Sequence, residues 1–526
     1  MSKIIGINNG PHDSSACLIV NGKIMCAIEE EKLTGVKACY TNYEHPVKSL
    51  AYIEQEFGVT VENCDHVVFS RTYLRQLVKD NPQLRDKITS FSHHDCHTLG
   101  SYLTSGFEGK VISLSHDGKG YRSRGKLYLC ENGQFEEIHS QHIPSTASLA
   151  GLWAVSTLHL GWRMLKDEGK VVGLAAHGKF SEEIYSHLKQ FMYYENFEFK
   201  PSNWECLFHY TFNTYKRDNA KVKEWREDFA FTLQKFTEEI FGEFLFDIHK
   251  NFPDYRKICF SGGLFANVKL NQFINELDIF DEIFIHPAMG DGGLALGAAL
   301  LKCHELGEIQ KPQRLQNAFL GPKHNFNDWN SAILESGLHI KKEPFSYANV
   351  GKLIDEGYVV GCFFGRTEYG PRALGNRSIV VKPTDPDTHR KLNEKLKRTE
   401  IMPFAPSVLK EEADRIFKCE KSKYSAEFMT LCYNARDEWK EKIPAVIQVL
   451  DGSARPQMVD YQLNPNFHSI ISAYYKLSGI PLVLNTSFNA HGEPINNYPS
   501  QVIKHLGDGS VDFIANEHYI LSISRD

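Results

Sequence analysis

Several apolar runs in the first part of the chain have the composition of β-strands, and three of them end directly in turns that contain glycine. These three are VISLSHDGKG, KICFSGG and FIHPAMGDGG, and helix-compatible stretches lie between the runs. Strands mixed with helices in this way indicate a layered α/β fold. Ligands of α/β folds bind at the ends of the strands, so these turns are candidates for a functional site.

Two of the turns open glycine-rich loops, at residues 260–271 and 290–300. Each loop follows an apolar run and leads into a helix-compatible stretch, so backbone N–H groups and a helix N-terminus can face phosphate groups there. Neither loop matches the P-loop or the G-x-G-x-x-G pattern. The two loops therefore argue against a Walker or Rossmann nucleotide site and favour an actin-like, sugar-kinase-like (ASKHA) fold.

The N-terminal residues predict a β-hairpin. The apolar runs SSACLIV and KIMCAIEEE flank the pair Asn21-Gly22. An Asn-Gly pair between two apolar runs is the strongest short signal for a hairpin. We therefore expect two antiparallel strands directly after the first strand, KIIGINNG.

The length of 526 residues favours two domains over one. Residues 180–255 are rich in aromatic and charged side chains and have few glycines, which predicts a helical insertion. Proline and polar residues cluster at 311–330, and a new α/β pattern begins near Tyr347. We predict domains at 1–345 and 346–526, and the sequence shows no internal repeat.

The composition excludes some classes of partner. Lys and Arg number 59 against 65 Asp and Glu, a net charge of -6, so no overall positive field attracts nucleic acid or anionic lipid. No apolar stretch reaches the roughly 18 residues of a membrane span, and the N-terminus has no export signal. The 12 cysteines contain no C-x-x-C pair. We expect a cytoplasmic protein without nucleic-acid or membrane partners, and leave homodimer formation open.

Two histidines and two aspartates suggest a metal site. His93 and His97 stand four residues apart and share one face of a helix, while Asp117 and Asp291 each follow an apolar strand and precede glycines. A mixed nitrogen and oxygen site suits Fe, Mn or Zn better than Ca. The alternative is that the His-rich helix start is a solvated or capped surface feature and that the Asp-Gly pairs only make turns.

Cationic residues gather in Gly-, Pro- and Asn-rich loops of the second half, at 365–378, 391–407, 451–457 and 485–495. Because arginine matches phosphate and carboxylate geometry, these loops predict a pocket for a triphosphate or an acyl phosphate. The alternative for any single residue is a solvated or structural charge. The cationic positions are Arg366, Arg372, Arg377, Lys395, Lys397, Arg398 and Arg455.

These motifs, which run nearly from end to end, resemble the NodU/CmcH carbamoyltransferase family. They include HDSSACLIVNGKI, AIEEEKLTGVK, HHDCH, EGKVVGLAAHG, SGGLFAN, HPAMGDGG, GRTEYGPRALGNRSI, RTEIMPFAPS, DGSARPQ and NTSFNAHGEP. The insertion at 180–255 and a linker near 310–345 lack them. The chain departs from the family's usual pattern at Met402, where many members have Arg, and at Gly35 and Val36, near which the family usually has another Arg.

The resemblance implies an N-terminal ASKHA-type domain joined to a C-terminal YrdC-like α/β domain. It implies that the second domain makes carbamoyladenylate from carbamoyl phosphate and ATP, with Mg bound to the ATP. It also implies that the metal site of the first domain transfers the carbamoyl group to a hydroxyl of a small natural-product or sugar acceptor. The metal expected there is Fe foremost, with Mn or Zn as alternatives. The metal ligands then fall on the four residues named above. Other contacts in the first domain fall on His12, Lys37 and Arg71, with Gly262, Gly263 and Asn267 near the nucleotide. Those in the second domain fall on Arg372, Arg377, Lys395, Arg398, Arg455, Ser487 and Asn489.

The chemistry assigns a role to some of these residues. A carbamoyl group is a poor electrophile, so adenylation supplies a leaving group and a metal polarises the carbonyl. Lys37 and Arg71 can neutralise the leaving phosphate, and His12 is the candidate base for the acceptor hydroxyl. Because water would hydrolyse carbamoyladenylate, we expect an internal passage between the two domains.

Three alternatives remain open: a small-molecule kinase of the ASKHA type, a tRNA threonylcarbamoyl transferase and a nucleotide-binding regulator. The kinase leaves the second domain unexplained, the tRNA enzyme needs a basic surface, and the regulator needs no metal ligands. The aromatic insertion at 180–255 is the expected acceptor site, with a buried helical core as the alternative.

Overall fold

The structure is a computed structural model, and the fold is mixed α/β. It describes residues 2–39, 46–70, 82–120, 122–143, 145–201, 219–398, 404–448 and 450–524. Two features of the sequence analysis, Arg71 and Met402, lie outside the described residues.

The first sheet has the strand order β3-β2-β1-β4-β5. β1 pairs antiparallel with β2, β2 pairs antiparallel with β3, and β1, β4 and β5 run parallel. The turn at Asn21-Gly22 joins β2 to β3, which confirms the predicted hairpin. The strands are β1 (Lys3–Asn8), β2 (Ser15–Val20), β3 (Lys23–Glu29), β4 (His66–Phe69) and β5 (Ile88–Ser90), with helices α1 (Glu30–Thr34) and α2 (Val47–Phe57).

The second sheet repeats this connectivity, with the order β12-β11-β6-β7-β8. In this sheet β6, β7 and β8 form an antiparallel meander, and β6, β11 and β12 run parallel. The sequence shows no repeat because a sheet topology requires only alternating apolar positions, which many sequences satisfy. The strands are β6 (Lys110–His116), β7 (Ser123–Glu131), β8 (Gln134–His142), β11 (Lys257–Ser261) and β12 (Glu282–Ile285).

Two helices pack between these sheets. α4 (His93–Ser105) lies on β6, β7 and β11, while α11 (Leu294–Glu305) lies on β1, β2 and β4. The two helices cross at glycines, where a Cβ on Gly100 would lie 2.8 Å from the Cα of Gly297. The absence of both side chains allows this close approach.

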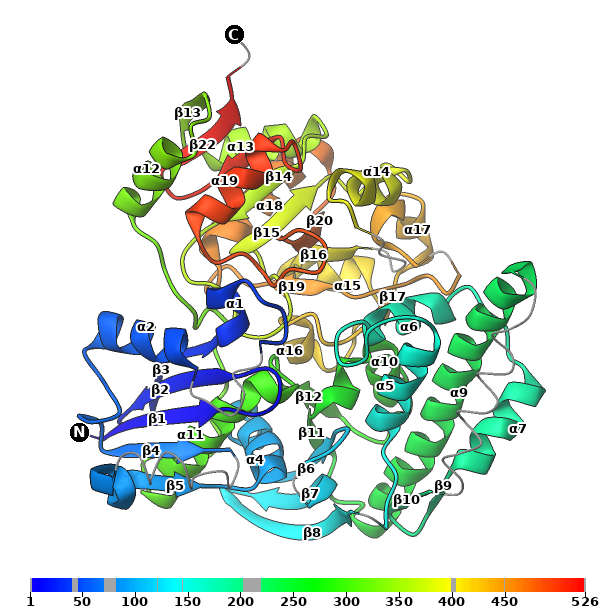
Figure 1. Cartoon of the computed structure of the whole chain (residues 1–526). Helices are drawn as coiled ribbons and strands as arrows, with labels where there is room; N and C mark the ends of the chain where they lie inside the picture. The colour runs from blue at the N-terminus through cyan, green and yellow to red at the C-terminus, as the bar shows by residue number, and fades with distance from the viewer. Residues whose placement is uncertain are drawn as a thin grey trace.

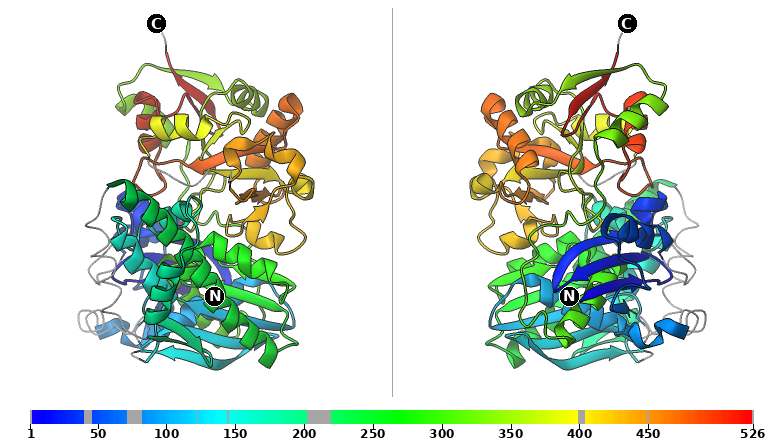
Figure 2. Two further views of the ribbon diagram at one scale, coloured as in Figure 1. Left: turned by 90° about the vertical axis from the view of Figure 1, so that its right-hand side faces the viewer. Right: turned by 90° about the vertical axis from the view of Figure 1, so that its left-hand side faces the viewer.

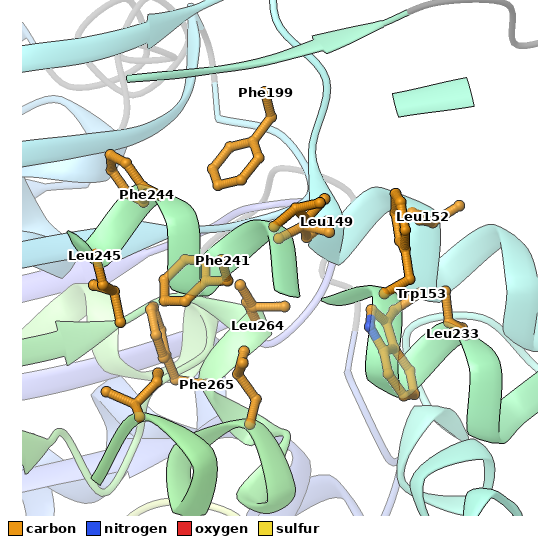
Figure 3. Close-up of a cluster of buried hydrophobic side chains, with 14 of the residues drawn as sticks. Leu149, Leu152, Trp153, Phe199, Leu233, Phe241, Phe244, Leu245, Leu264 and Phe265 are labelled. Carbon is orange, nitrogen blue, oxygen red and sulfur yellow. The ribbon is translucent and has the colours of Figure 1, made fainter. Parts of the chain in front are cut away.

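The insertion predicted at 180–255 is mainly helical and also contains a short hairpin. Figure 3 shows its aromatic side chains, with Phe199, Phe241 and Phe244 turned toward Leu149 and Phe265 of the surrounding domain. The three phenylalanines are fully buried, so they form core rather than an acceptor site. The elements of this region and those flanking it are α5 (Leu149–His159), α6 (Glu168–Ala175), α7 (Glu182–Phe191), β9 (Met192–Glu195), β10 (Glu198–Pro201), α9 (Asn219–Asn251) and α10 (Val268–Glu276).

The C-terminal part is built on an eight-stranded sheet with the order β13-β22-β21-β14-β15-β20-β16-β19. Figures 1 and 2 show it, in yellow to red, stacked on the blue-to-green N-terminal part. The strands are β13 (Ile340–Pro344), β14 (Val360–Phe363), β15 (Arg377–Val381), β16 (Ala405–Leu409), β19 (Gln457–Val459), β20 (Leu482–Ser487), β21 (Phe513–Ala515) and β22 (Tyr519–Ile523), with a small pair β17 (Tyr433–Asn434) and β18 (Ser453–Ala454). The helices are α12 (Phe326–Glu335), α13 (Tyr347–Asp355), α14 (Thr388–Lys395), α15 (Ala413–Ile416), α16 (Lys423–Ala426), α17 (Asp437–Lys440), α18 (Pro465–Ser478) and α19 (Pro499–Gly507).

Two elements that precede residue 345, the predicted boundary, pack with the C-terminal part. β13 pairs with β22, and Trp329 of α12 belongs to the core of the C-terminal part. Figure 1 shows α12 and β13 beside β22, at the far end from β1. The sequence did not reveal that α12 belongs to the C-terminal part, because this short helix begins within the polar segment 311–330 and buries only one face.

The two parts share a buried interface. The Lys32 ammonium is 1% exposed, donates to the carbonyl oxygens of Glu368 and Gly370, and lies 3.0 Å from Glu29 Oε2. The guanidinium of Arg366 donates to carbonyl oxygens of the N-terminal part, among them that of Met25 at 2.8 Å. One apolar cluster includes residues of both parts, so the parts do not own entirely separate cores.

Two further observations concern the whole described chain. Among the described helices, no helix is both long enough and apolar enough to cross a membrane. The 11 cysteines in the described residues are all buried and unpaired.

Candidate metal centre and active-site cavity

The metal-ligand candidates begin with helix α4. The Ser92 hydroxyl caps its N-terminus by accepting from the backbone N–H of Asp95, so the helix starts at His93. His93 and His97, one turn apart, are both buried. The Nδ1 atom of His97 lies 3.1 Å from Ser261 Oγ, which fixes the ring and directs Nε2 away from Ser261.

Asp117 and Asp291 face these two rings, Asp117 from the end of β6 and Asp291 from the turn between β12 and α11. Asp117 directly follows β6, and the backbone N–H of Gly118 donates to its Oδ1 at 2.7 Å. Asp291 opens a short 3-10 helix before α11. The Nε2 atom of His97 lies 3.3 Å from Asp117 Oδ2 and 3.3 Å from Asp291 Oδ1, and that of His93 lies 3.4 and 3.5 Å from the same oxygens.

These distances fit a shared metal ion. All four ligand atoms lie within 4.8 Å of one another. Metal–ligand bonds of about 2.0–2.1 Å in a tetrahedron place neighbouring ligand atoms about 3.3–3.4 Å apart, whereas direct charge-assisted hydrogen bonds are about 2.7–2.9 Å. The nitrogen and oxygen atoms therefore have the spacing that ligands around a common centre would have.

The electrostatics also suit a cation. Burial acts to raise the pKa of Asp291, but the positive charges of His93 and His12 and a hydrogen bond from His97 hold it well below its ordinary value. Burial likewise acts to lower the pKa of His97, and hydrogen bonds to Asp117 and Asp291 raise it to about 9. The carboxylates thus stay ionised and present negative charge at the centre of the four side chains.

A single cavity of about 550 Å³ joins this centre to the C-terminal part. Its lining brings together residues predicted from both halves of the chain. They are His12, Lys37, Asp117, Gly263, Asn267, Asp291, Arg372, Arg398, Arg455, Ser487 and Asn489.

Several predicted residues lie near the cavity without lining it. His93 and His97 stand behind the two aspartates, and Gly262 makes the turn after β11 at a φ of 104°, where a Cβ would lie 2.3 Å from the carbonyl oxygen of His116. Arg377 is fully buried and donates to the carbonyl oxygens of Phe364, Gly365 and Asn376. Lys395 pairs with Asp512. The structure therefore does not bring Arg377 and Lys395 together with the other cationic candidates.

Arg398 anchors the loop that follows β20. Its guanidinium donates to Thr486 Oγ1 at 2.8 Å and to the carbonyl oxygens of Ser487 and Asn489 at 2.7 Å. The same side chain lines the cavity and is 9% exposed. Arg398 therefore holds the predicted ligand loop in shape as well as contributing charge.

Sequence reasoning missed part of the lining. Trp153 of α5, residues 163 and 165–167 between α5 and α6, residues 168–170 at the start of α6, and the carboxylates of Asp13, Glu29 and Glu31 all line the cavity. No described residue of 180–255 lines it. The segments EGKVVGLAAHG and AIEEEK could have pointed to some of these lining residues, because both have charged residues among apolar ones.

A buried cluster of two His and two Asp that opens into a cavity lined by glycine turns and arginines suits a group-transfer enzyme. The chain belongs to the carbamoyltransferase family: residues 3–79 and 71–300 match the family description "Carbamoyltransferase N-terminus" and residues 351–522 match "Carbamoyltransferase C-terminus". This confirms the resemblance seen in the motifs and identifies the protein as a transferase.

Individual relatives agree with the family. The chain is 30% identical over 528 residues to the nodulation protein NolNO of Sinorhizobium fredii, covering 93% of this chain and 75% of that protein. It is 32% identical to an uncharacterised protein of Methanocaldococcus jannaschii, over 83% of this chain and 74% of the relative. Among solved structures, the activator of 2-hydroxyisocaproyl-CoA dehydratase from Clostridium difficile is 15% identical and covers 59% of this chain and 97% of its own, with a TM-score of 0.38, too low to support an argument.

Proposed function

We propose that the protein is an O-carbamoyltransferase that uses ATP and carbamoyl phosphate to make carbamoyladenylate and then carbamoylates a hydroxyl of a small molecule. The observation that carries this proposal is the single cavity, whose lining reaches from the metal-ligand candidates to Arg372, Arg398 and Arg455. Two sites that share one internal space can pass on an intermediate that water would destroy.

The activation step belongs in the C-terminal part, for which we propose a YrdC-like function. Arg372, Arg398 and Arg455 supply positive charge for the phosphates of ATP and carbamoyl phosphate, with Mg bound to the ATP. Ser487 and Asn489 add polar groups on the same wall. Arginine forks match phosphate geometry, so these side chains orient the reacting groups as well as neutralise them.

The transfer step belongs in the N-terminal part, for which we propose an ASKHA-type domain because its two sheets share one connectivity. His93, His97, Asp117 and Asp291 would hold the metal, for which we propose iron, with manganese or zinc as alternatives. Such an ion polarises the carbamoyl carbonyl when it is bound.

Three further groups act around the metal-ligand candidates. The Lys37 side chain neutralises the leaving phosphate, and His12 lies beside the metal-ligand candidates, with 3.8 Å between its Nε2 and Asp291 Oδ2. The turn at Gly263 exposes backbone N–H groups to the nucleotide, because a Cβ there would approach Asp117 Oδ1 to 3.0 Å.

One experiment tests this function directly. The full-length protein is incubated with ATP, Mg and carbamoyl phosphate in the absence of an acceptor, and the quenched mixture is analysed by mass spectrometry. We expect carbamoyladenylate to accumulate in an amount that follows the protein concentration. ADP without carbamoyladenylate would instead support the small-molecule kinase and refute the proposal.

A further inference from the structure

Two carboxylates that have no role in the scheme above line the same cavity as His12. Asp13 follows His12 in the loop between β1 and β2, and Glu31 lies on α1. Both line the cavity. Asp13 has a φ of 51°, a left-handed conformation that Asp adopts more readily than most residues, and it lies in the turn after His12.

Glu31 is held in place from two sides. Its Oε2 accepts from the backbone N–H of Ala38 at 2.7 Å, and its carbonyl oxygen accepts from the N–H of Gly35 at 2.8 Å. These bonds close the loop that carries Lys37 over the cavity. Among the described residues, Oε1 of Glu31 makes no hydrogen bond, so it is the oxygen that can accept from a ligand.

The surroundings of Glu31 favour a carboxylate that takes up a proton near neutral pH. Burial raises its pKa to about 7, and the negative charges of Asp13 and Glu29 act in the same direction. The hydrogen bond from Ala38 and the charge of Lys32 act in the opposite direction. A general base works best when its pKa lies near the operating pH.

His12 is less well placed to accept a proton. Its Nδ1 lies 2.9 Å from Asp13 Oδ2, and its Nε2 faces Asp291 Oδ2. The Nδ1 atom is thus engaged with Asp13, and Nε2 is turned toward a second carboxylate, which favours the protonated ring over a ring that accepts a proton.

We propose that Asp13 and Glu31 form the site of the acceptor hydroxyl and that Glu31 is its general base. This inference rests on the proposed function. The acceptor oxygen bonds to the carbamoyl carbon, the bond from that carbon to the phosphate oxygen breaks, AMP leaves with the electron pair, and the hydroxyl proton passes to Glu31 Oε1. Two neighbouring carboxylates repel anions, so the acceptor is an alcohol without negative charge near the reacting hydroxyl.

The test separates transfer from activation in the full-length, metal-loaded protein. Carbamoyladenylate is formed on the enzyme and then chased between pH 5.5 and 9 with glycerol or with hydroxylamine, a nucleophile that needs less help from a base. In the wild type, the glycerol rate should rise with pH and level off above about pH 7, because the base must be deprotonated. Glu31→Gln should lose about 10²–10⁴-fold with glycerol, show no rise, and lose much less with hydroxylamine.

Two variants guard against a structural explanation. Glu31→Asp keeps a carboxylate and should retain the rise with pH at a lower rate. Glu54→Gln removes an exposed carboxylate of the neighbouring α2 and should behave as the wild type.

Three results would overturn the assignment: a glycerol rate in Glu31→Gln within about threefold of the wild type, equal losses with both nucleophiles, or loss of carbamoyladenylate formation in that variant. Failure of the wild type to form carbamoyladenylate would instead refute the proposed function itself.

Discussion

Lys32→Met tests the interface between the two parts of the chain. The methionine retains the apolar stem of the lysine but removes an ammonium that is 1% exposed and lies 3.0 Å from Glu29 Oε2. The carbonyl oxygens of Glu368 and Gly370 lose their donor as well. Removing one partner of a buried ion pair destabilises a protein by about 3–5 kcal/mol, because the remaining charge stays buried without compensation.

We therefore expect the free energy of unfolding to fall by about 3 kcal/mol or more. Urea unfolding followed by tryptophan fluorescence reports on both parts, since Trp153 and Trp329 lie in the two different cores. Because Lys32 joins the parts, the variant should also unfold in two transitions at lower urea concentration. The matched control is Lys476→Met, an exposed lysine of α18, which should change the stability by less than about 0.5 kcal/mol. A loss below about 1 kcal/mol in Lys32→Met would show that this buried contact is not an important source of stability.

Three other predictions address the sites. His93→Ala and Asp291→Ala should lose the bound transition metal, measured by elemental analysis, and should lose carbamoyl transfer while carbamoyladenylate formation continues; full transfer in both would exclude the metal site. Arg398→Ala should reduce carbamoyladenylate formation by at least about 2 kcal/mol in transition-state free energy, because the variant loses both a phosphate contact and the anchor of the loop after β20; an unchanged yield would refute this role. Fragments 1–325 and 326–526 should be poorly soluble alone and recover activity when co-expressed, since one apolar cluster spans both; independent folding of both fragments would contradict this dependence.

The sequence was informative about strand ends and less so about the state of individual charges. The turns after β6 and before α11 were visible because apolar runs stop at Asp-Gly and Gly-Gly pairs, and Asp117 and Asp291 do lie together. Whether they bind a metal stays a prediction. Arg366 and Arg377 have the same local composition as Arg372, yet both donate to backbone carbonyl groups. No local pattern reveals whether a guanidinium has already used its donors, because its partners come from distant segments.

Longer-range features were also beyond the sequence. The aromatic residues of α9 could equally have faced a ligand, and only the packing of Phe241 and Phe244 in the surrounding domain shows that they are core. Glu31 lies in an acidic run that any exposed helix could carry. Its position in the cavity depends on the close packing of α1 against the C-terminal part, which no single segment specifies.

The glycine crossing of α4 and α11 has a consequence for the proposed metal site. His97 lies one turn before Gly100, and Asp291 lies just ahead of the helix that carries Gly297. The contact between the two glycines fixes how closely α4 and α11 approach each other. The distance between the ligand atoms of His97 and Asp291 depends on this approach. A methyl group on either glycine would meet backbone atoms at 2.8 Å or less and would push the two helices apart. At the proposed metal site, the spacing of the ligand atoms therefore depends on two glycines that are not ligands themselves.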